Sequence, residues 1–211
     1  MTLTDEPKSL SITAVREARY EALRQPHIAP LTNFVERLRS HIGATYHVPY
    51  FDPLDGGVNA ECLFLLEAPG PNAVRSGFVS RNNPDETAKN FFLLNQQAGI
   101  DRSRTVTWNI VPWYVGTGTK IRAVNGNDIK VALPSLQELL SLLRLLRVVV
   151  LVGRKAAAAR TTVVSLAPTV QIFETPHPSP MFVNRSPKNR DAILSVLKRI
   201  SERVSAVQSG G

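Results

Sequence analysis

The sequence predicts an α/β fold: a single three-layer α/β/α sandwich with a mostly parallel four-stranded central sheet. Short apolar runs alternate with stretches of helical periodicity along most of the chain. The runs are apolar at consecutive positions, which is typical of parallel strands covered by helices on both faces. The 211 residues suffice for one domain with a sizeable core. We therefore expect a single domain over residues 1–211, with residues 1–60 as a helical N-terminal extension packed on it.

The four predicted strands are the apolar runs, and helical stretches lie between and around them. Runs of four to six apolar or β-branched residues favour strands. The strands are expected at Cys62–Leu66, Val106–Val111, Val148–Val152 and Val170–Phe173.

Periodicity and capping signals predict the helices. Asn83-Pro84-Asp85-Glu86 places a capping residue, a proline and two acids where the positive end of a helix dipole would lie, so a helix to about Gln97 is expected, ending at Gly99. Pro134-Ser135 predicts the start of a leucine-rich helix to about Leu146, and Asn125-Gly126 a turn. Other helices are expected at Ile12–Leu23, Leu31–Ile42, Ala156–Arg160 and Pro187–Val204, with loop over 47–57.

Composition excludes several classes of protein. Hydrophobic residues make up 43% and charged residues 20%, which is ordinary for a globular chain. No apolar run approaches the roughly 18 residues of a membrane span, and Met1–Ser9 lacks the apolar core of a secretory signal. Cys62 is the one cysteine, which excludes an internal disulfide and a cluster held by several thiolates. We expect a cytoplasmic, nucleoid-associated monomer without metal, cofactor or membrane contact.

Basic residues are concentrated in the last third of the chain. Residues 1–143 hold 14 basic and 14 acidic side chains, whereas residues 144–203 hold 11 basic and 3 acidic ones. A segregated basic surface is typical of proteins that bind a phosphate backbone. A solvated basic face would have the same composition. Charge alone leaves both interpretations open.

Polar or glycine-containing segments follow all four predicted strands. The carboxyl ends of parallel strands meet at one edge of a sheet, where ligands of such folds bind. We therefore expect a site built from four strand exits: Glu67-Ala68-Pro69-Gly70, Asn109, Gly153-Arg154-Lys155 and His177-Pro178-Ser179-Pro180.

Two of these segments carry a family resemblance. Leu66-Glu67-Ala68-Pro69-Gly70 and His177-Pro178-Ser179-Pro180, in this order and spacing, resemble motifs of the uracil-DNA glycosylase superfamily. The similarity covers roughly Leu63 to Pro187. The first segment is close to the motif of the branch whose members carry an iron–sulfur cluster, but the cysteines of that branch are absent here.

The resemblance implies roles for the base-binding residues. Glu67 matches the functional glutamate that places water, and Ala68, Pro69 and Gly70 match the pocket floor. Asn109 matches the asparagine that reads the uracil amide edge. His177 matches the histidine that hydrogen-bonds uracil O2, and Phe78 the aromatic residue that stacks on the base. Glu67, Asn109 and His177 are thus the expected catalytic residues.

The resemblance also implies a DNA-contacting set. Gly153 matches a glycine-rich turn that grips phosphate with backbone amides, and Met181 an apolar wedge that fills the gap left by an extruded base. The other expected DNA contacts are Arg154, Lys155, Ser179, Arg185 and Lys188. Phe78 is equally typical of a core position, and Met181 of a flexible filler.

The chemistry of these residue types agrees with base excision. An asparagine amide offers one donor and one acceptor, which match O4 and N3–H of uracil. A histidine donor in a dry site stabilises the departing anionic base. A carboxylate orients or deprotonates water and favours a cationic sugar. The implied function is hydrolysis of the N-glycosidic bond of uracil in DNA, leaving an abasic site during base excision repair.

Departures from the family pattern leave alternatives. Leu66 stands in place of a glycine, Ala68 in place of an aspartate that activates water in another branch, and Gly70 in place of a tyrosine that excludes the thymine methyl. No lysine stands at a motif position to form a Schiff base, so a monofunctional enzyme is expected. The alternatives are a non-catalytic base-binding or nucleic-acid-binding module of the same fold, a glycosylase for another damaged base, and an unrelated nucleotide-binding α/β protein.

Overall fold

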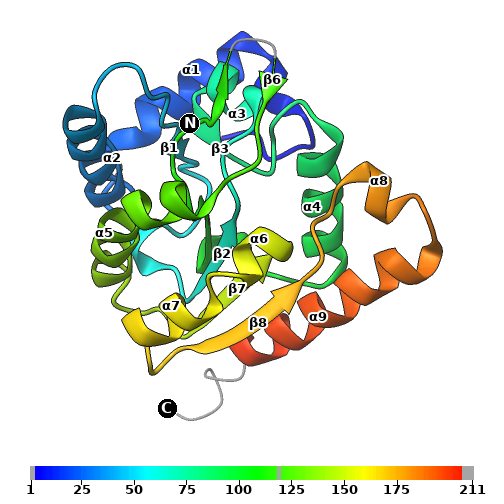
Figure 1. Ribbon diagram of the computed structural model, residues 1–211. Helices are drawn as coiled ribbons and strands as arrows, with labels where there is room; N and C mark the ends of the chain where they lie inside the picture. Colours follow the sequence, from blue (N-terminus) through cyan, green and yellow to red (C-terminus); the bar gives the residue numbers. More distant parts are fainter. Residues whose placement is uncertain (1–2, 118–119, 206–211) are drawn as a thin grey trace.

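A four-stranded sheet lies between two layers of helices in the computed structural model, which describes residues 3–117 and 120–205 (Figure 1). All neighbouring strands in this sheet pair in parallel, in the order β4-β2-β7-β8. The predicted α/β fold is confirmed, and its sheet is parallel throughout. The strands are β2 (Cys62–Leu66), β4 (Thr105–Asn109), β7 (Val148–Val152) and β8 (Gln171–Thr175).

The two central strands, β2 and β7, are buried on both faces. Leu63 and Val149 face a core formed with α2 (Ala29–Ile42), α5 (Gly126–Leu142), α6 (Arg154–Ala157) and α7 (Arg160–Leu166). Phe64 and Val150 face a second core formed with α4 (Glu86–Gln97) and α9 (Pro187–Ser205). Figure 1 shows α2 and α5 on one side of the sheet and α4 and α9 on the other. This double coverage explains why both strands are apolar at consecutive positions.

The edge strand β4 has two chemically different faces. Val106 and Trp108 belong to the core under α2 and α5. Thr105, Thr107 and Asn109 alternate with them, and successive side chains of a strand point to opposite faces. The predicted strand Val106–Val111 is found at Thr105–Asn109, and it is apolar on one face and polar on the face toward α4.

Helix boundaries depend on side-chain caps that the sequence analysis assigned incorrectly in two places. The Asn125 side chain accepts a hydrogen bond from the Asp128 amide, and Asp128 accepts one from the Asn125 amide. This capping box starts α5 at Gly126, so Pro134 lies inside the helix and not at its start. Helix α4 is capped by Asp85, which accepts from the Ala88 amide.

Short elements complete the chain. The predicted helices near residues 12–23 and 156–160 are each divided, the first into α1 (Thr13–Glu21) and a 3₁₀ turn (Ala22–Arg24), the second into α6 and α7. The expected loop over 47–57 contains β1 (Tyr50–Phe51), which pairs with β3 (Phe78–Val79). The remaining elements are α3 (Pro71–Ser76), α8 (Pro180–Val183), β5 (Gly116–Thr117), β6 (Lys120–Ile121) and 3₁₀ turns at Ser9–Ser11, Gly57–Asn59 and Arg102–Arg104. Over residues 3–117 and 120–205, none of the helices has the length and apolarity to cross a membrane.

A buried cluster of charges joins the N-terminal segment to the sheet. The Arg102 guanidinium donates to Asp52 and Asp55, each at 2.8 Å, and contacts Asp5. Arg19 of α1 lies 3.4 Å from the same Asp52, and both side chains are inaccessible to solvent. Burial alone would raise the pKa of Asp52, but the two guanidinium groups hold it below its usual range.

The cluster also positions the segment that follows β3. Ser80 donates to Asp52, and the Asn82 side-chain oxygen accepts from Arg102 at 2.6 Å. Residues 80–83 therefore take their conformation from the same buried charges, and this segment forms one wall of the cleft described below.

Replacing Arg102 by methionine leaves Asp52 and Asp55 buried without their main partner. We expect Arg102→Met to lower the free energy of unfolding by about 3–5 kcal/mol at pH 7, measured by urea denaturation. The pair with Asp52 stabilises the fold above the unfolded-state aspartate pKa, and its contribution is lost as the pH falls through the lowered pKa of the folded state. The cost should therefore shrink below about pH 4.

The matched control for this variant is Arg160→Met. Arg160 pairs with Glu174 at the surface, so its loss should change stability by less than about 0.5 kcal/mol. Equal losses in the two variants would show that the buried cluster does not hold the fold.

Candidate active site

A cleft of about 580 Å³ opens at the carboxyl edge of the sheet. The chain order reverses at β2, because β4 pairs on one side of it and β7 on the other. Helix α4, which follows β2, and α5, which follows β4, therefore cover opposite faces and leave a crevice between them. The cleft is lined by Leu66, Glu67, Ala68, Pro69, Gly70, Pro71, Asn72, Ala73, Val79, Ser80, Arg81, Asn83, Asp85, Thr87, Ala88, Phe91, Thr107, Asn109, Val115, Arg122, Ala123, His177 and Pro178.

The structure brings the three predicted catalytic side chains into this one cleft. Asn109 ends β4, and Glu67 and His177 follow β2 and β8. Beyond the strands, the amides of Ile110 and Val111 donate to the carbonyls of Leu66 and Glu67. Two further backbone hydrogen bonds beyond the ladder thus hold the two exits side by side.

The Asn109 side chain is buried, and its Nδ2 has no hydrogen-bond partner among the described residues. An unpaired buried amide costs about 1–3 kcal/mol. A ligand acceptor in the cleft would remove that cost.

Neighbouring elements hold His177 in place. Gly153 has φ +88°, and a Cβ added there would lie 3.1 Å from the His177 Cβ. The Asn90 side chain of α4 donates to the Pro178 carbonyl at 3.1 Å. Burial lowers the pKa of His177, although the negative charges of Glu67 and Asp85 act in the opposite direction. At pH 7 the imidazole is therefore neutral and donates from one ring nitrogen.

Glu67 and Lys155 hold the two backbone groups of Val124. A carboxylate oxygen of Glu67 accepts from the Val124 amide at 3.1 Å, and the Lys155 ammonium donates to the Val124 carbonyl at 3.0 Å. Arg122 and Ala123, which line the cleft, immediately precede this residue. One oxygen of Glu67 is thus committed to holding a cleft wall.

The predicted pocket floor lies where it was expected. Ala68, Pro69 and Gly70 all line the cleft between β2 and α3. A Cβ built on Gly70 would meet no atom within 4 Å, and its φ of −82° suits any residue. The space beside residue 70 is therefore open.

The structure does not place Phe78 in the cleft. Its ring is 0% exposed and packs with Leu10 and Leu23, and the Tyr20 ring lies 4.7 Å from it. Strand β3 directs the side chain toward the N-terminal helices, so the prediction that Phe78 stacks on a base is wrong for this conformation. The aromatic side chain that lines the cleft is Phe91 of α4.

The predicted DNA-contacting residues lie outside the lining of the cleft. Met181 of α8 is 87% exposed, just beyond His177 and Pro178. Ser179 caps α8, with the Phe182 amide 3.4 Å from its oxygen. Gly153 supports His177, and Lys155 contacts Val124, as described above. Arg154, Arg185 and Lys188 are exposed.

The sequence analysis missed the polar wall of the cleft. Arg81 and Thr107 line it but were not singled out, and neither was Phe91. The alternation of Thr105-Val106-Thr107-Trp108-Asn109 was a usable signal, since it indicates a strand with one polar face. Nothing comparable marks Arg81, because only the tertiary fold brings residues 80–83 against β4.

The sole cysteine does not fit an iron–sulfur cluster. Cys62 is buried within the sheet at the start of β2, and burial raises the pKa of its thiol. Within residues 3–117 and 120–205, no group of three His, Cys, Asp or Glu side chains is arranged to hold a metal ion.

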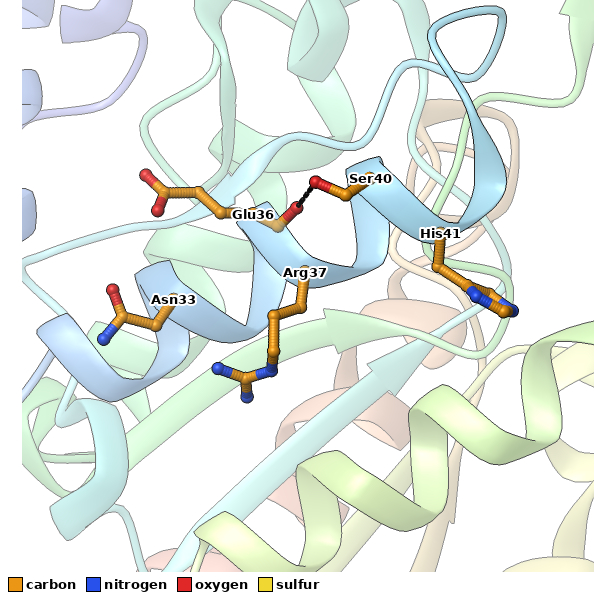
Figure 2. A pocket seen from close by; sticks show the side chains of 5 residues that line it. All are labelled: Asn33, Glu36, Arg37, Ser40 and His41. Carbon is orange, nitrogen blue, oxygen red and sulfur yellow. Dashed lines mark hydrogen bonds between the residues drawn. The ribbon is translucent and has the colours of Figure 1, made fainter.

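A second hollow, of about 590 Å³, lies on the outer surface of α2 (Figure 2). Its lining residues all come from this one helix, and Figure 2 shows Glu36 and Arg37 pointing in different directions. Arg37 pairs with Glu138 of α5, and Ser40 bonds to the Glu36 carbonyl. These side chains do not converge on a common point, so the carboxyl-edge cleft is the better candidate site.

Comparisons with known proteins identify a family for this chain. The family description "Uracil DNA glycosylase superfamily" matches residues 53–200. A solution NMR structure from Methanosarcina acetivorans, provisionally described as a uracil DNA glycosylase, is 17% identical. The match covers 67% of this chain and 91% of that chain, with a TM-score of 0.44. A search of curated proteins found no significant match.

The parallel sheet and the cleft at its strand exits define an α/β protein with a candidate ligand site at the topological switch point. The match over residues 53–200 spans most of the chain, which therefore belongs to the uracil DNA glycosylase superfamily. Members of this superfamily are in general N-glycosylases that act on DNA.

The contact between Gly153 and His177 predicts that an added methyl group will displace the imidazole. At φ +88° a non-glycine residue is itself strained by about 1–3 kcal/mol. We expect Gly153→Ala to move His177 toward solvent and to raise its pKa from below 6.5 toward the ordinary value, measured by NMR titration of the imidazole.

Gly70→Ala is the matched control, because a Cβ there meets no neighbour. It should leave the His177 titration unchanged. An unchanged titration in Gly153→Ala as well would mean that the glycine does not support the histidine.

Proposed function

We propose that this protein is a monofunctional DNA glycosylase that hydrolyses the N-glycosidic bond of uracil in DNA. The observation that carries the proposal is the meeting of Asn109 and His177 in one cleft at the carboxyl edge, the first with an unpaired buried amide and the second half-buried beside it. An amide reads the edge of a base, and an imidazole N–H donates to a departing anion.

The side chains that line the cleft could supply each step of this hydrolysis. Water adds to C1′ of the deoxyribose, the electron pair of the C1′–N1 bond leaves with the base, and the proton of the water passes to the Glu67 carboxylate and from there to solvent or to the anionic base. His177 would donate to O2 as negative charge develops there, while Ala68, Pro69 and Gly70 bound the base and Phe91 offers an aromatic surface. The oxygen of Glu67 that does not bond to Val124 remains for the attacking water.

A hydrolytic mechanism suits the side chains of the cleft. A bifunctional glycosylase needs an amine nucleophile to form a Schiff base with the sugar. No lysine is among the lining residues, and the ammonium of nearby Lys155 is bonded to the Val124 carbonyl.

DNA would approach the rim formed by α8 and the start of α9. Arg185 and Lys188 are exposed there and take part in no ion pair among the described residues. Arg154 is exposed at the neighbouring strand exit. Such free cations suit phosphate contacts.

One observation favours a second candidate, a non-catalytic base-binding module. Ala68 provides no carboxylate, and one oxygen of Glu67 is already bonded to the Val124 amide. A protein with this cleft could therefore bind an extruded base and turn over slowly or not at all.

Incubation with end-labelled oligonucleotides, followed by alkali, separates the two candidates. The substrates carry one uracil in a single strand, in a U·A duplex or in a U·G duplex. We expect strand breaks at uracil and a single-turnover rate about 100-fold lower for His177→Ala. His41→Ala, which alters an exposed histidine of α2, is the matched control and should retain the full rate. Binding without strand breaks would favour the module.

Met181 provides a test of base extrusion. Extruding a base leaves an unstacked gap that costs a few kcal/mol, least when the base is mismatched or unpaired, and an apolar wedge offsets part of this cost. Met181→Ala should therefore slow excision most from U·A, less from U·G and least from single strands. Leu145→Ala, an exposed apolar residue that precedes β7 at the opposite edge, should slow none of them. Equal losses on all three substrates would assign Met181 to packing.

A further inference from the structure

Three buried polar groups without partners belong to the same cleft. They are Nδ2 of Asn109, Oγ1 of Thr107 and Nε of Arg81, and each of these residues is at most 4% exposed. Buried polar groups in native proteins are nearly always paired, and each exception calls for an explanation. Unpaired groups gathered around one cavity are explained if the pairing groups belong to a ligand.

The unpaired hydroxyl of Thr107 is the hardest of the three to explain by a structural role. Its backbone amide is bonded to Asp55, and its side chain lies on the polar face of β4 between Thr105 and Asn109. A valine has almost the same shape and would not bury an unpaired hydroxyl. Without a ligand, therefore, the Thr107 hydroxyl lowers the stability of the protein.

Thr105 shows what a structural threonine looks like on the same face. Its hydroxyl donates to the Arg102 carbonyl at 3.0 Å and accepts from Arg81 Nη2 at 2.8 Å. The Thr105 hydroxyl thus both donates and accepts a hydrogen bond within the protein. The Thr107 hydroxyl, two residues further along the strand, does neither among the described residues.

Arg81 is a buried cation that forms no ion pair within 4.0 Å among the described residues, although the charge of Asp55 acts on it from further away. Its only described hydrogen bond goes to Thr105, and its guanidinium lies 5.6 Å from the centre of the Phe91 ring. Arg102 takes the nearby carboxylates Asp52 and Asp55. Arg81 therefore keeps donors free at the wall of the cleft, as a site for an oxygen acceptor requires.

We propose that Thr107 and Arg81 are specificity-determining residues, which with Asn109 donate hydrogen bonds to ring carbonyl oxygens of an extruded base. The inference rests on the proposed function and adds two residues that would recognise its base. A row of side-chain donors pairs with the carbonyl oxygens of an oxo-base. An exocyclic amino group would instead present its own N–H donors to them, and donors on both sides would be left unpaired. Leaving such groups unpaired in a buried site excludes a ligand far more effectively than a difference of shape.

Thr107→Val tests the proposal by moving stability and activity in opposite directions. Removing an unpaired hydroxyl should raise the melting temperature of the free protein by about 2–4 °C. The same change should lower kcat/KM for uracil in DNA about 10-fold, because the carbonyl loses a partner. Thr107→Ser, which keeps the hydroxyl, should recover most of the activity. A residue with only a structural role would not produce this pair of effects.

Thr105→Val is the matched control on the same strand. Its hydroxyl is fully paired, so its loss should lower the melting temperature. A fall in melting temperature for Thr107→Val too, or unchanged kcat/KM in that variant, would overturn the proposal.

Substrate analogues test the carbonyl contact directly. The loss caused by Thr107→Val or Arg81→Met should be about 10-fold on uracil and less than 2-fold on the analogue that lacks the contacted oxygen, which is 2-pyrimidinone for the 4-oxo group and 4-pyrimidinone for the 2-oxo group. Equal losses on uracil and both analogues would contradict the assignment. The Thr107 variant keeps this test valid if Arg81→Met fails to fold.

Binding separates a failure of this inference from a failure of the proposed function. Fluorescence anisotropy with single-stranded oligonucleotides that carry uracil or cytosine needs no catalysis. If no base is excised but the wild type prefers the uracil strand and Thr107→Val abolishes that preference, the specificity assignment stands and the enzyme assignment fails. If uracil is excised and the variant keeps the full preference, only the specificity assignment fails.

Discussion

The place of β2 in the sheet is the constraint on which the site depends. Because β4 and β7 pair on its two sides, the helices that follow β2 and β4 cover opposite faces, and a crevice is left at the carboxyl edge. Glu67, Asn109 and His177 are far apart in the sequence, yet they meet there because each follows or ends a parallel strand. Two backbone hydrogen bonds from residues 110 and 111 to residues 66 and 67 hold the exits of β2 and β4 together.

Two largely buried arginines beside this cleft, Arg102 and Arg81, differ in whether carboxylates pair with them. Arg102 neutralises Asp52 and Asp55 and thereby holds residues 80–83 in place. Arg81, within that same segment, has no carboxylate within ion-pair distance among the described residues. The paired charges of Arg102, Asp52 and Asp55 thus support a wall in which polar groups of Arg81 and Thr107 have no partner among the described residues. Such a division is expected at binding sites, where stability is given up locally and recovered from the surrounding structure.

Strands covered on both faces were the easiest part of the fold to predict. Cys62–Leu66 and Val148–Val152 match β2 and β7 at both ends, because double burial demands apolar residues at every position. Helix starts were harder, since Asn125 and Pro134 both carry starting signals and only the hydrogen bonds of the capping box decide between them. The prediction for Phe78 failed for a related reason. A sequence does not reveal to which side of a two-residue strand an aromatic ring points, and this ring points away from the cleft.

The sequence by itself determined the α/β class and placed Glu67, Asn109 and His177 at or just after strand ends, because parallel strands bring their carboxyl ends to one edge whatever the details of packing. Tertiary structure alone decided which other groups face the cleft. Arg81 and Phe91 reach it from a loop and a helix whose positions depend on buried charges and core packing. Whether a polar atom is paired also depends on neighbours distant in the chain, so Thr105 and Thr107, alike in sequence, differ in the folded protein.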